Sequence, residues 1–201
     1  MAERPDLWQL ERALFAQGYQ TICGVDEAGA GPLAGRVYAA AVILPRGWDH
    51  PYLNDSKRVT PRRRELLYEA ITQQALAWSV AWAEPEEIDA INILQARMLA
   101  MERAIQGLSM PPDLALIDGN RSQGITTPNQ TVVKGDGKSA SIAAASILAK
   151  VCRDRYMAEM DGVYPQYGFA QHKGYPTKLH YERLRQYGPC PIHRKTFLKK
   201  L

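Results

Sequence analysis

The stretch that decides the fold reads Gly24-Val25-Asp26-Glu27-Ala28-Gly29-Ala30-Gly31-Pro32 and lies near the start of a chain of 201 residues. An apolar run leads into two adjacent acids and then into a glycine turn, the pattern of a strand that ends tightly. Because neighbouring strand residues point to opposite faces, either Asp26 or Glu27 must face the packed side of a sheet. A buried carboxylate is costly unless a cation meets it, so the pair is a candidate set of metal ligands.

Two further acids also follow short apolar runs and stand beside glycine. They are Asp118 in Leu116-Ile117-Asp118-Gly119-Asn120 and Asp136 in Val132-Val133-Lys134-Gly135-Asp136-Gly137. One Asp-Gly step alone is usually a turn or a cap. Three such strand ends together predict one divalent-cation site of four carboxylates, and hard oxygen ligands favour Mg²⁺ or Mn²⁺. Two such ions support in-line phosphoryl displacement.

The remaining pattern predicts a mixed α/β sheet with helices packed on it. Thr60-Pro61 provides a capping hydroxyl and a first-turn proline for one helix, and Ile91 to Ile105 carry one continuous apolar stripe along another. Small residues in 143–146 allow the strongest helix to approach the sheet closely. The expected strands are 21–27, 36–44, 76–84, 114–117 and 131–133, and the expected helices are 7–18, 60–74, 85–107, 138–160 and 177–187.

Charge is unevenly placed along the chain. Residues 172–201 hold eight Lys or Arg and one acid, interleaved with tyrosines, and a second basic run spans 57–64. A basic run alone is usually a solvated surface, but the aromatic interleaving favours a nucleic-acid partner. No apolar run approaches the length of a membrane span. The three cysteines show no spacing typical of disulfide pairs, and no secretory signal is visible. A cytoplasmic protein without disulfides is therefore expected.

One competing motif is rejected. Residues 29–34 nominally match the dinucleotide fingerprint G-x-G-x-x-A. Pro32 and a second strand follow where that fingerprint requires a helix, and the preceding acids would repel a pyrophosphate. The glycines more plausibly let a backbone approach a ligand closely.

Over about residues 20–197 the chain resembles the bacterial ribonuclease HII, or type 2 ribonuclease H, family. The resemblance rests on several motifs in addition to the acidic ones. These motifs are Leu53-Asn54-Asp55-Ser56-Lys57, Ala144-Ala145-Ser146-Ile147-Leu148-Ala149-Lys150-Val151 continuing to Arg153-Asp154, and Tyr164-Pro165-Gln166-Tyr167-Gly168-Phe169 continuing to His172-Lys173-Gly174-Tyr175.

The resemblance implies an RNase H-like fold, a five-stranded mixed sheet flanked by helices with a helical C-terminal extension. Within a single domain, an N-terminal helix to about residue 19, a core over about 20–161 and a basic extension over about 162–201 are expected. The implied activity is Mg²⁺- or Mn²⁺-dependent cleavage of the RNA strand of RNA–DNA hybrids. Incision 5′ of single ribonucleotides in duplex DNA is also implied, leaving 3′-hydroxyl and 5′-phosphate ends. A monomer is expected, and no motif for a sliding clamp is recognised, which leaves that partner open.

Roles for individual residues also follow from the resemblance. Asp26, Glu27, Asp118 and Asp136 are implied as the catalytic, metal-binding acids. The turn Gly29-Ala30-Gly31 and Tyr175 are implied to read the 2′-hydroxyl, which is the group that separates RNA from DNA. The implied phosphate and substrate contacts are Asn54, Ser56, Lys57 and Lys173, and the supporting residues are Lys150, Arg153 and Asp154.

One position departs from the family. The family's glycine turn carries Arg or Lys where this chain has Ala30. A charge-assisted contact is worth about 1.5–3 kcal/mol, so either another cation (Lys57, Lys173 or Arg121) replaces it or the activity is weakened. A hybrid-binding protein with crippled chemistry is therefore one alternative to the enzyme. A DNA nuclease or integrase of similar architecture is another, against which Tyr175 and the glycine turn argue.

Overall fold

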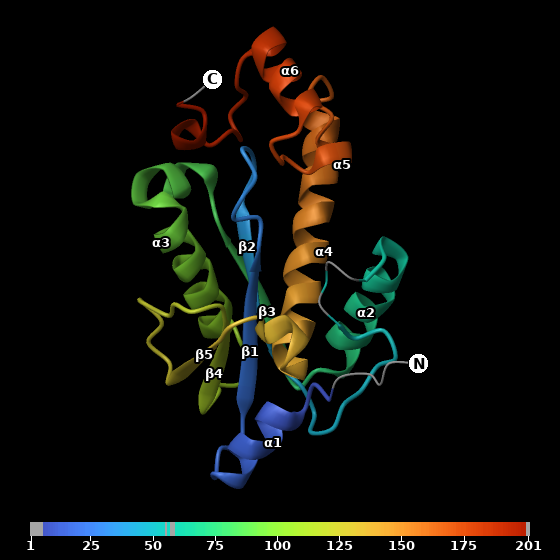
Figure 1. Ribbon diagram of the computed structural model, residues 1–201, viewed down its shortest axis with the longest axis vertical. Helices are drawn as coiled ribbons and strands as arrows, with labels where there is room; N and C mark the ends of the chain where they lie inside the picture. Colours follow the sequence, from blue (N-terminus) through green and yellow to red (C-terminus); the bar gives the residue numbers. More distant parts are fainter. Residues whose placement is uncertain (1–5, 55, 57–58, 200–201) are drawn as a thin grey trace.

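The computed structural model describes residues 6–54, 56 and 59–199 and contains a five-stranded mixed sheet. The strand order is β3-β2-β1-β4-β5, with β1 antiparallel to β2, β2 antiparallel to β3, and β4 parallel to both β1 and β5 (Figure 1). The predicted sheet is confirmed. Its strands are β1 (Ile22–Ala28), β2 (Val37–Ile43), β3 (Ala77–Ala83), β4 (Leu114–Asp118) and β5 (Asn129–Val132).

Helices cover both faces of the sheet, and Figure 1 shows α3 and α4 on opposite sides of it. Alternate residues of β2 divide between two apolar clusters: Ala40 and Val42 pack with α4, whereas Ala39 and Ala41 pack with α3. The helices are α1 (Gln9–Ala16), α2 (Pro61–Gln74), α3 (Pro85–Gln106), α4 (Ala140–Val163), α5 (Phe169–His172) and α6 (Lys178–Tyr187), with short 3₁₀ turns η1 (Gly135–Gly137) and η2 (Lys195–Phe197).

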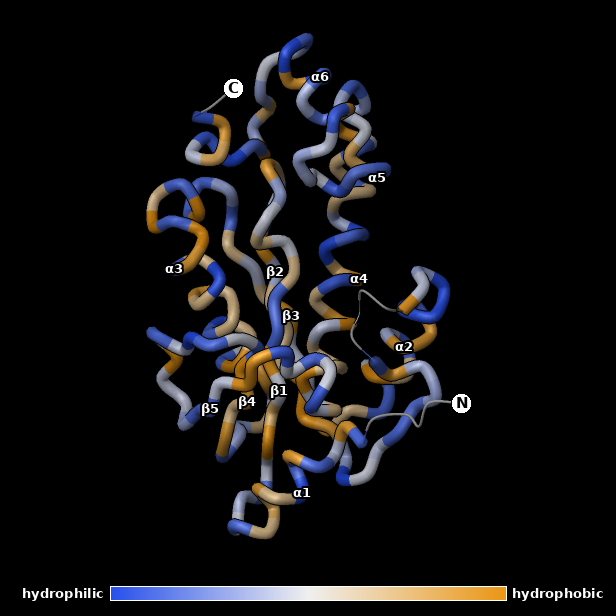
Figure 2. The backbone as a smooth tube through the Cα atoms, in the orientation of Figure 1, coloured by the Kyte–Doolittle hydropathy of each residue, from blue (hydrophilic) through white to orange (hydrophobic). Residues whose placement is uncertain are grey.

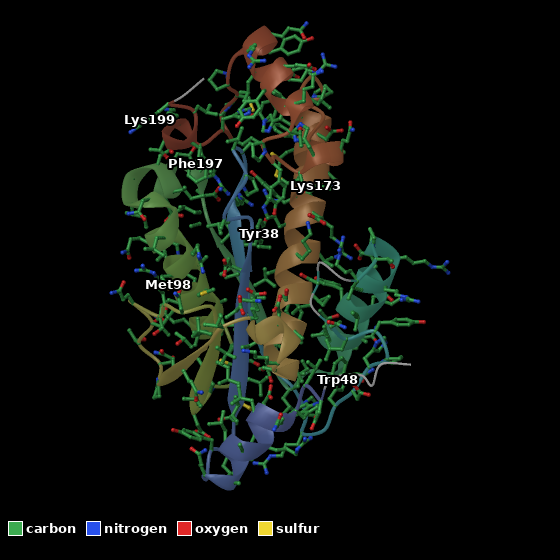
Figure 3. All side chains as sticks on the ribbon, in the orientation of Figure 1. Tyr38, Trp48, Met98, Lys173, Phe197 and Lys199 are labelled. Atoms are coloured by element: carbon green, nitrogen blue, oxygen red, sulfur yellow. The ribbon has the colours of Figure 1, made fainter. Side chains whose placement is uncertain are left out.

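The core lies where the sheet meets α4 and α3. Figure 2 shows hydrophobic segments gathered around β1 and β4, and Figure 3 labels Met98 on α3, where its side chain is buried against the sheet. At Gly24 a Cβ atom would lie 2.0 Å from the backbone carbon of Ser141. Only glycine at this position lets the first turn of α4 lie directly on β1, which also carries the two adjacent acids.

Three local predictions need correction. Thr60 precedes α2, but its hydroxyl makes no capping hydrogen bond. The stripe of α3 is interrupted at Asn92, whose φ of 66° breaks the helix and whose side chain accepts hydrogen bonds from the Leu94 and Gln95 amides (3.0 and 3.2 Å). Ile91 is exposed as a result. No helix was expected between residues 160 and 177, but the structure has the short helix α5 there.

In the part of the chain that the structure describes, none of the helices combines the length and the apolar character that crossing a membrane would require.

Candidate active site

Strand register brings two of the predicted acids together. In the parallel pair β1–β4, Val25 lies opposite Ile117, so the next residues along, Asp26 and Asp118, lie side by side where β4 ends. Each lies two residues after a residue that faces α4, Gly24 in β1 and Leu116 in β4. Their side chains therefore point to the α4 face of the sheet. Adjacent strands lie about 4.8 Å apart. The two carboxylates therefore lie on one face of the sheet, at the C-terminal end of β4.

Asp26 is the buried member of the first acidic pair, with 5% of its surface exposed. Burial raises the pKa of its carboxyl well above the usual value, and the negative charges of Glu27 and Asp118 raise the pKa further. A hydrogen bond from the Ser146 side chain and one from the Glu27 amide (2.7 Å) oppose this rise. Three acids thus interact electrostatically at this point, and a cation there would relieve their repulsion.

The other acids are oriented by contacts that the sequence did not reveal. Glu27 points to the α3 side of the sheet, where its Oε1 lies 3.2 Å from Nε of Arg97. Asp118 Oδ1 accepts a hydrogen bond from the Gly135 amide at 2.6 Å. This bond ties the end of β4 to η1, the turn that carries the half-buried Asp136. The four predicted acids therefore lie on β1, β4 and η1, which meet at the C-terminal end of β4.

Carboxylate oxygens suit a hard divalent ion, but the described side chains do not by themselves form a complete coordination shell. Within residues 6–54, 56 and 59–199, no three His, Cys, Asp or Glu side chains form a group that could hold a metal ion. Mg²⁺ commonly takes only one or two carboxylates and completes its shell with water and substrate phosphates. These acids therefore fit an ion held jointly with a phosphate, and the four-carboxylate site stays a prediction.

The glycine turn follows β1 directly and lies beside Tyr175. Gly29 has a φ of +99°, and a Cβ there would lie 2.1 Å from Nε of Arg153, so glycine is required on both counts. A Cβ at the exposed Gly31 would be 3.9 Å from Cε1 of Tyr175. Tyr175 is 41% exposed. The two features predicted to read a sugar therefore line one accessible surface.

Arg153, one of the predicted supporting residues, is fully buried beneath this turn. Its Nη2 donates to the carbonyl oxygens of Lys173 (2.9 Å) and Ala34 (3.4 Å). Lys150, a second predicted supporting residue, does pair with an acid: its Nζ lies 2.6 Å from Oδ1 of Asp154. Burial lowers the pKa of Lys150, and the hydrogen bond to Asp154 opposes that change.

A basic cleft of about 530 Å³ separates α2 from α4. Figure 3 labels Lys173 beside the C-terminal half of α4, where its Nζ donates to the Asp154 carbonyl oxygen at 3.5 Å. The charged residues that line this cleft are Arg64, Glu65, Lys150, Asp154, Arg155 and Lys173.

The predicted phosphate contacts around residue 54 are placed only in part. Ser56 is buried and shares a hydrogen bond with the Ser146 hydroxyl at 2.8 Å. Ser146 also bonds Asp26, so it connects the buried acid to this loop. Asn54 is half-buried. Lys57 lies outside the described residues, and its predicted role stays a prediction.

A buried group of histidines was not predicted at all. His172 and His180 stack with ring centroids 4.3 Å apart, and Nε2 of His180 lies 3.0 Å from Nε2 of His193. Burial lowers the pKa of all three, to about 4 for His180 and His193. Their sequence spacing matches no metal motif, so only the fold reveals the cluster.

These histidines give the stability a pH dependence of definite sign. The unfolded chain binds protons at imidazoles near pH 6.5, whereas folded His180 and His193 bind them only near pH 4. The unfolded state therefore holds more protons between these values, and the free energy of unfolding must fall as pH drops through this window. We expect each of the two histidines to contribute a loss of about 3 kcal/mol between pH 7 and pH 4, measured by urea unfolding.

The matched control for that measurement is His180→Asn, which removes one titrating imidazole. Its stability should fall less steeply over the same range. Asp26 and Glu11 have raised pKa values and act with the opposite sign, so the difference between the two proteins isolates the histidine contribution. Equal slopes for both proteins would contradict the assignment.

Sequence reasoning also missed two arginines at the site. Arg97 meets Glu27, and the fully buried Arg194 donates hydrogen bonds to carbonyl oxygens of the glycine turn, including Gly29 O at 2.7 Å. In the sequence both are ordinary basic residues of a helix and of a basic tail. Ser146 offered a weak signal, because it is a polar residue within an alanine-rich segment of α4.

Comparisons with known proteins identify the family of this chain. The family model described as ribonuclease HII matches residues 23–200. A ribonuclease HII of Vibrio parahaemolyticus is 56% identical over 183 residues, which are 91% of this chain and 87% of that protein. One from Caldicellulosiruptor bescii is 49% identical over 201 residues, 100% of this chain and 98% of its own length.

A solved structure supports the same grouping. The crystal structure of the ribonuclease H2 from Pyrococcus horikoshii matches with a TM-score of 0.71 at 27% identity, covering 88% of this chain and 93% of that one. The chain belongs to the ribonuclease HII family and is an endoribonuclease of the ribonuclease H type.

Proposed function

We propose that this protein cleaves the RNA strand of RNA–DNA hybrids and incises duplex DNA on the 5′ side of single embedded ribonucleotides, in a reaction that needs Mg²⁺ or Mn²⁺. The observation that carries the proposal is the placement of the acidic strand ends next to the Gly29–Gly31 turn and Tyr175. One surface thus offers ligands for a cation and a contact for a ribose. The expected products carry 3′-hydroxyl and 5′-phosphate ends.

The four acids Asp26, Glu27, Asp118 and Asp136 would hold the divalent ion. When bound, that ion supplies activation of the attacking water and neutralisation of charge on the phosphoryl group. The protein's own contribution is orientation: the Gly135 amide fixes the Asp118 carboxylate at 2.6 Å, and Arg97 lies 3.2 Å from the Glu27 carboxylate. Groups fixed before the substrate binds need no reorganisation during the reaction.

Substrate recognition is proposed for the glycine turn and the basic cleft. The turn would bring backbone groups close to the 2′-hydroxyl, and the ring of Tyr175 would stack on the sugar. Lys173 and the neighbouring cations of the cleft, together with Asn54, Ser56 and Lys57, would contact phosphates. Such phosphate contacts position a duplex without reading its sequence.

The central experiment uses three duplexes of one sequence: one with a single ribonucleotide, one with a uniform RNA strand, and one of DNA only. We expect cleavage of the first two with Mg²⁺ or with Mn²⁺, none of the third, and none after chelation. End mapping should locate the incision on the 5′ side of the ribonucleotide. Cleavage of the DNA duplex, or activity in excess chelator, would contradict the proposal.

Tyr175→Ala tests the recognition half of the proposal separately. Loss of a ring that stacks on a sugar is expected to cost about 1–3 kcal/mol, so the preference for a single-ribonucleotide duplex over a uniform hybrid should fall about tenfold or more. The measurement is the ratio of kcat/KM for the two substrates. The matched control is Tyr187→Ala, because Tyr187 is also an exposed tyrosine but lies at the end of α6. An unchanged ratio in Tyr175→Ala would exclude Tyr175 from recognition.

A further inference from the structure

The segment from Cys190 to Arg194 lies between the glycine turn and the loop that carries Tyr175. Its backbone is joined to the residues after the turn: the Gly35 amide donates to the Ile192 carbonyl oxygen (2.8 Å) and the Arg194 amide donates to the Leu33 carbonyl oxygen (2.9 Å). The Leu33 amide in turn donates to Gly174 O at 2.8 Å. In Figure 1 this red segment approaches the ends of β1 and β2.

On one side of the segment, Arg194 holds the turn from within. Its Nη2 donates to Gly29 O (2.7 Å), its Nη1 to Ala30 O (3.1 Å) and Pro32 O (2.8 Å), and its Nε to Gly35 O (2.9 Å). Arg194 is completely buried. A planar guanidinium with five donors can reach four carbonyl groups at once, whereas a lysine ammonium has three donors at one point.

On the other side, His193 is linked to Tyr175 through His180. The Cys190 amide donates to Nδ1 of His193 at 2.9 Å, so that nitrogen is an acceptor and Nε2 of His193 carries the proton. Nε2 of His193 then donates to Nε2 of His180 at 3.0 Å. The remaining nitrogen of His180, Nδ1, donates to the Tyr175 carbonyl oxygen at 3.0 Å. One tautomer of each imidazole therefore accounts for all three hydrogen bonds.

We propose that Arg194 and His180 are positioning residues: Arg194 fixes the glycine turn and His180 fixes the loop of Tyr175, and together they determine how strictly the protein requires a ribose at the junction. This inference rests on the proposed function, because it assumes that the turn and Tyr175 form the ribose contact. Neither residue touches the substrate in this assignment. They act by fixing the separation of two surfaces that come from distant parts of the chain.

The burial of both groups explains why they hold position. Arg194 and His180 have no exposed surface and His193 has 2%, so each would leave buried polar atoms unsatisfied if it moved. A displacement of about 1 Å at a recognition contact can cost on the order of a hundredfold in rate. A loosened turn should therefore weaken the distinction between substrates more than it weakens the fold.

The test uses a matched pair at His180. Asn places its amide nitrogen where Nδ1 of His180 lies and keeps the donor to Tyr175 O, whereas Gln places its amide near Nε2 and loses that donor. We expect His180→Asn to keep the ratio of kcat/KM for a single-ribonucleotide duplex to that for a uniform hybrid, and His180→Gln to lower it about tenfold. Arg194→Lys should lower it as well, and Arg185→Ala, which removes an exposed arginine of α6, should leave it unchanged.

Amide hydrogen exchange at Leu33 provides a readout that does not depend on activity. Its bond to Gly174 O spans the turn and the loop, so exchange should accelerate about tenfold or more in His180→Gln and Arg194→Lys but not in His180→Asn. If Arg194→Lys fails to fold, the His180 pair still decides the matter. Equal protection and equal substrate ratios in Asn and Gln would overturn the positioning role.

The two readouts also separate this inference from the proposed function. If the parent protein shows no dependence on a ribonucleotide, the proposed function fails, and with it the assigned effect on ribose recognition. Altered Leu33 exchange in such a protein would still show that the His180 contact holds the turn in place. Altered exchange together with an altered substrate ratio supports both.

Discussion

Asp118→Asn is expected to reduce cleavage of a single-ribonucleotide duplex by about a thousandfold while leaving duplex binding nearly unchanged. Loss of one ligand charge at a phosphoryl-transfer site removes several kcal/mol of stabilisation from the transition state, and each 1.4 kcal/mol is about tenfold in rate. Asn keeps an oxygen that can accept the Gly135 amide bond now made at 2.6 Å. The variant should therefore fold normally and differ mainly in charge.

Asp113→Asn is the matched control for that prediction. Asp113 directly precedes β4, whereas Asp118 ends it, and the exposed Asp113 carboxylate accepts hydrogen bonds from the Gln20 and Thr21 amides (2.8 and 2.9 Å). The same chemical change at the opposite end of one strand should leave kcat nearly unchanged, and as a surface substitution it should also change the stability little. Full activity in Asp118→Asn, or a thousandfold weaker Kd, would contradict the assignment of Asp118 as a metal-binding acid.

Ala30→Arg is expected to raise kcat on the same substrate by about tenfold to a hundredfold. The gain corresponds to a charge-assisted hydrogen bond to the scissile phosphate, worth about 1.5–3 kcal/mol. Ala30 is half-buried, and its carbonyl oxygen already accepts from Arg194 at 3.1 Å, so a longer side chain can extend outward without disturbing that backbone bond. The effect should shrink as salt concentration rises.

Ala30→Gln separates charge from length in this comparison. It should give little of the gain, because it reaches as far as a short cation but carries no charge. Strong cleavage by the parent chain with no gain in Ala30→Arg would mean that another cation already serves the phosphate. Of the candidates, Lys173 lines the basic cleft and Arg121 is exposed in the loop after β4, whereas Lys57 lies outside the described residues. Cleavage seen only in Ala30→Arg would instead favour the catalytically weakened binding variant.

Much of the fold follows from local patterns of apolar and breaking residues. The strands and the long helices lie within a few residues of their predicted limits, because alternation, apolar runs and Pro-Gly signals act over short distances. The predicted continuous helix is wrong at Asn92, and the reason is again a short-range interaction. A side chain that bonds its own following amides competes with the helix, and a count of apolar spacing does not register that competition.

For the site, the sequence by itself determined that the acids lie in or directly after the strands and where the glycine turn stands. Strand alternation also determined that one acid of the first pair must be buried, and Asp26 is that acid. These properties depend on neighbouring residues alone. They limit which ligands can bind, because carboxylate oxygens favour hard divalent ions, and the metal-binding role of the acids stays a prediction.

Only the tertiary structure decided how those pieces are held. The parallel register of β1 and β4 sets Asp26 beside Asp118, and Arg194 reaches back across more than 150 positions of sequence to the carbonyl groups of the turn. The histidines join the loop of Tyr175 in the same way. The physical reason is that a buried donor is satisfied by whichever carbonyl group the packed fold brings near it, and local sequence carries no record of that distant partner.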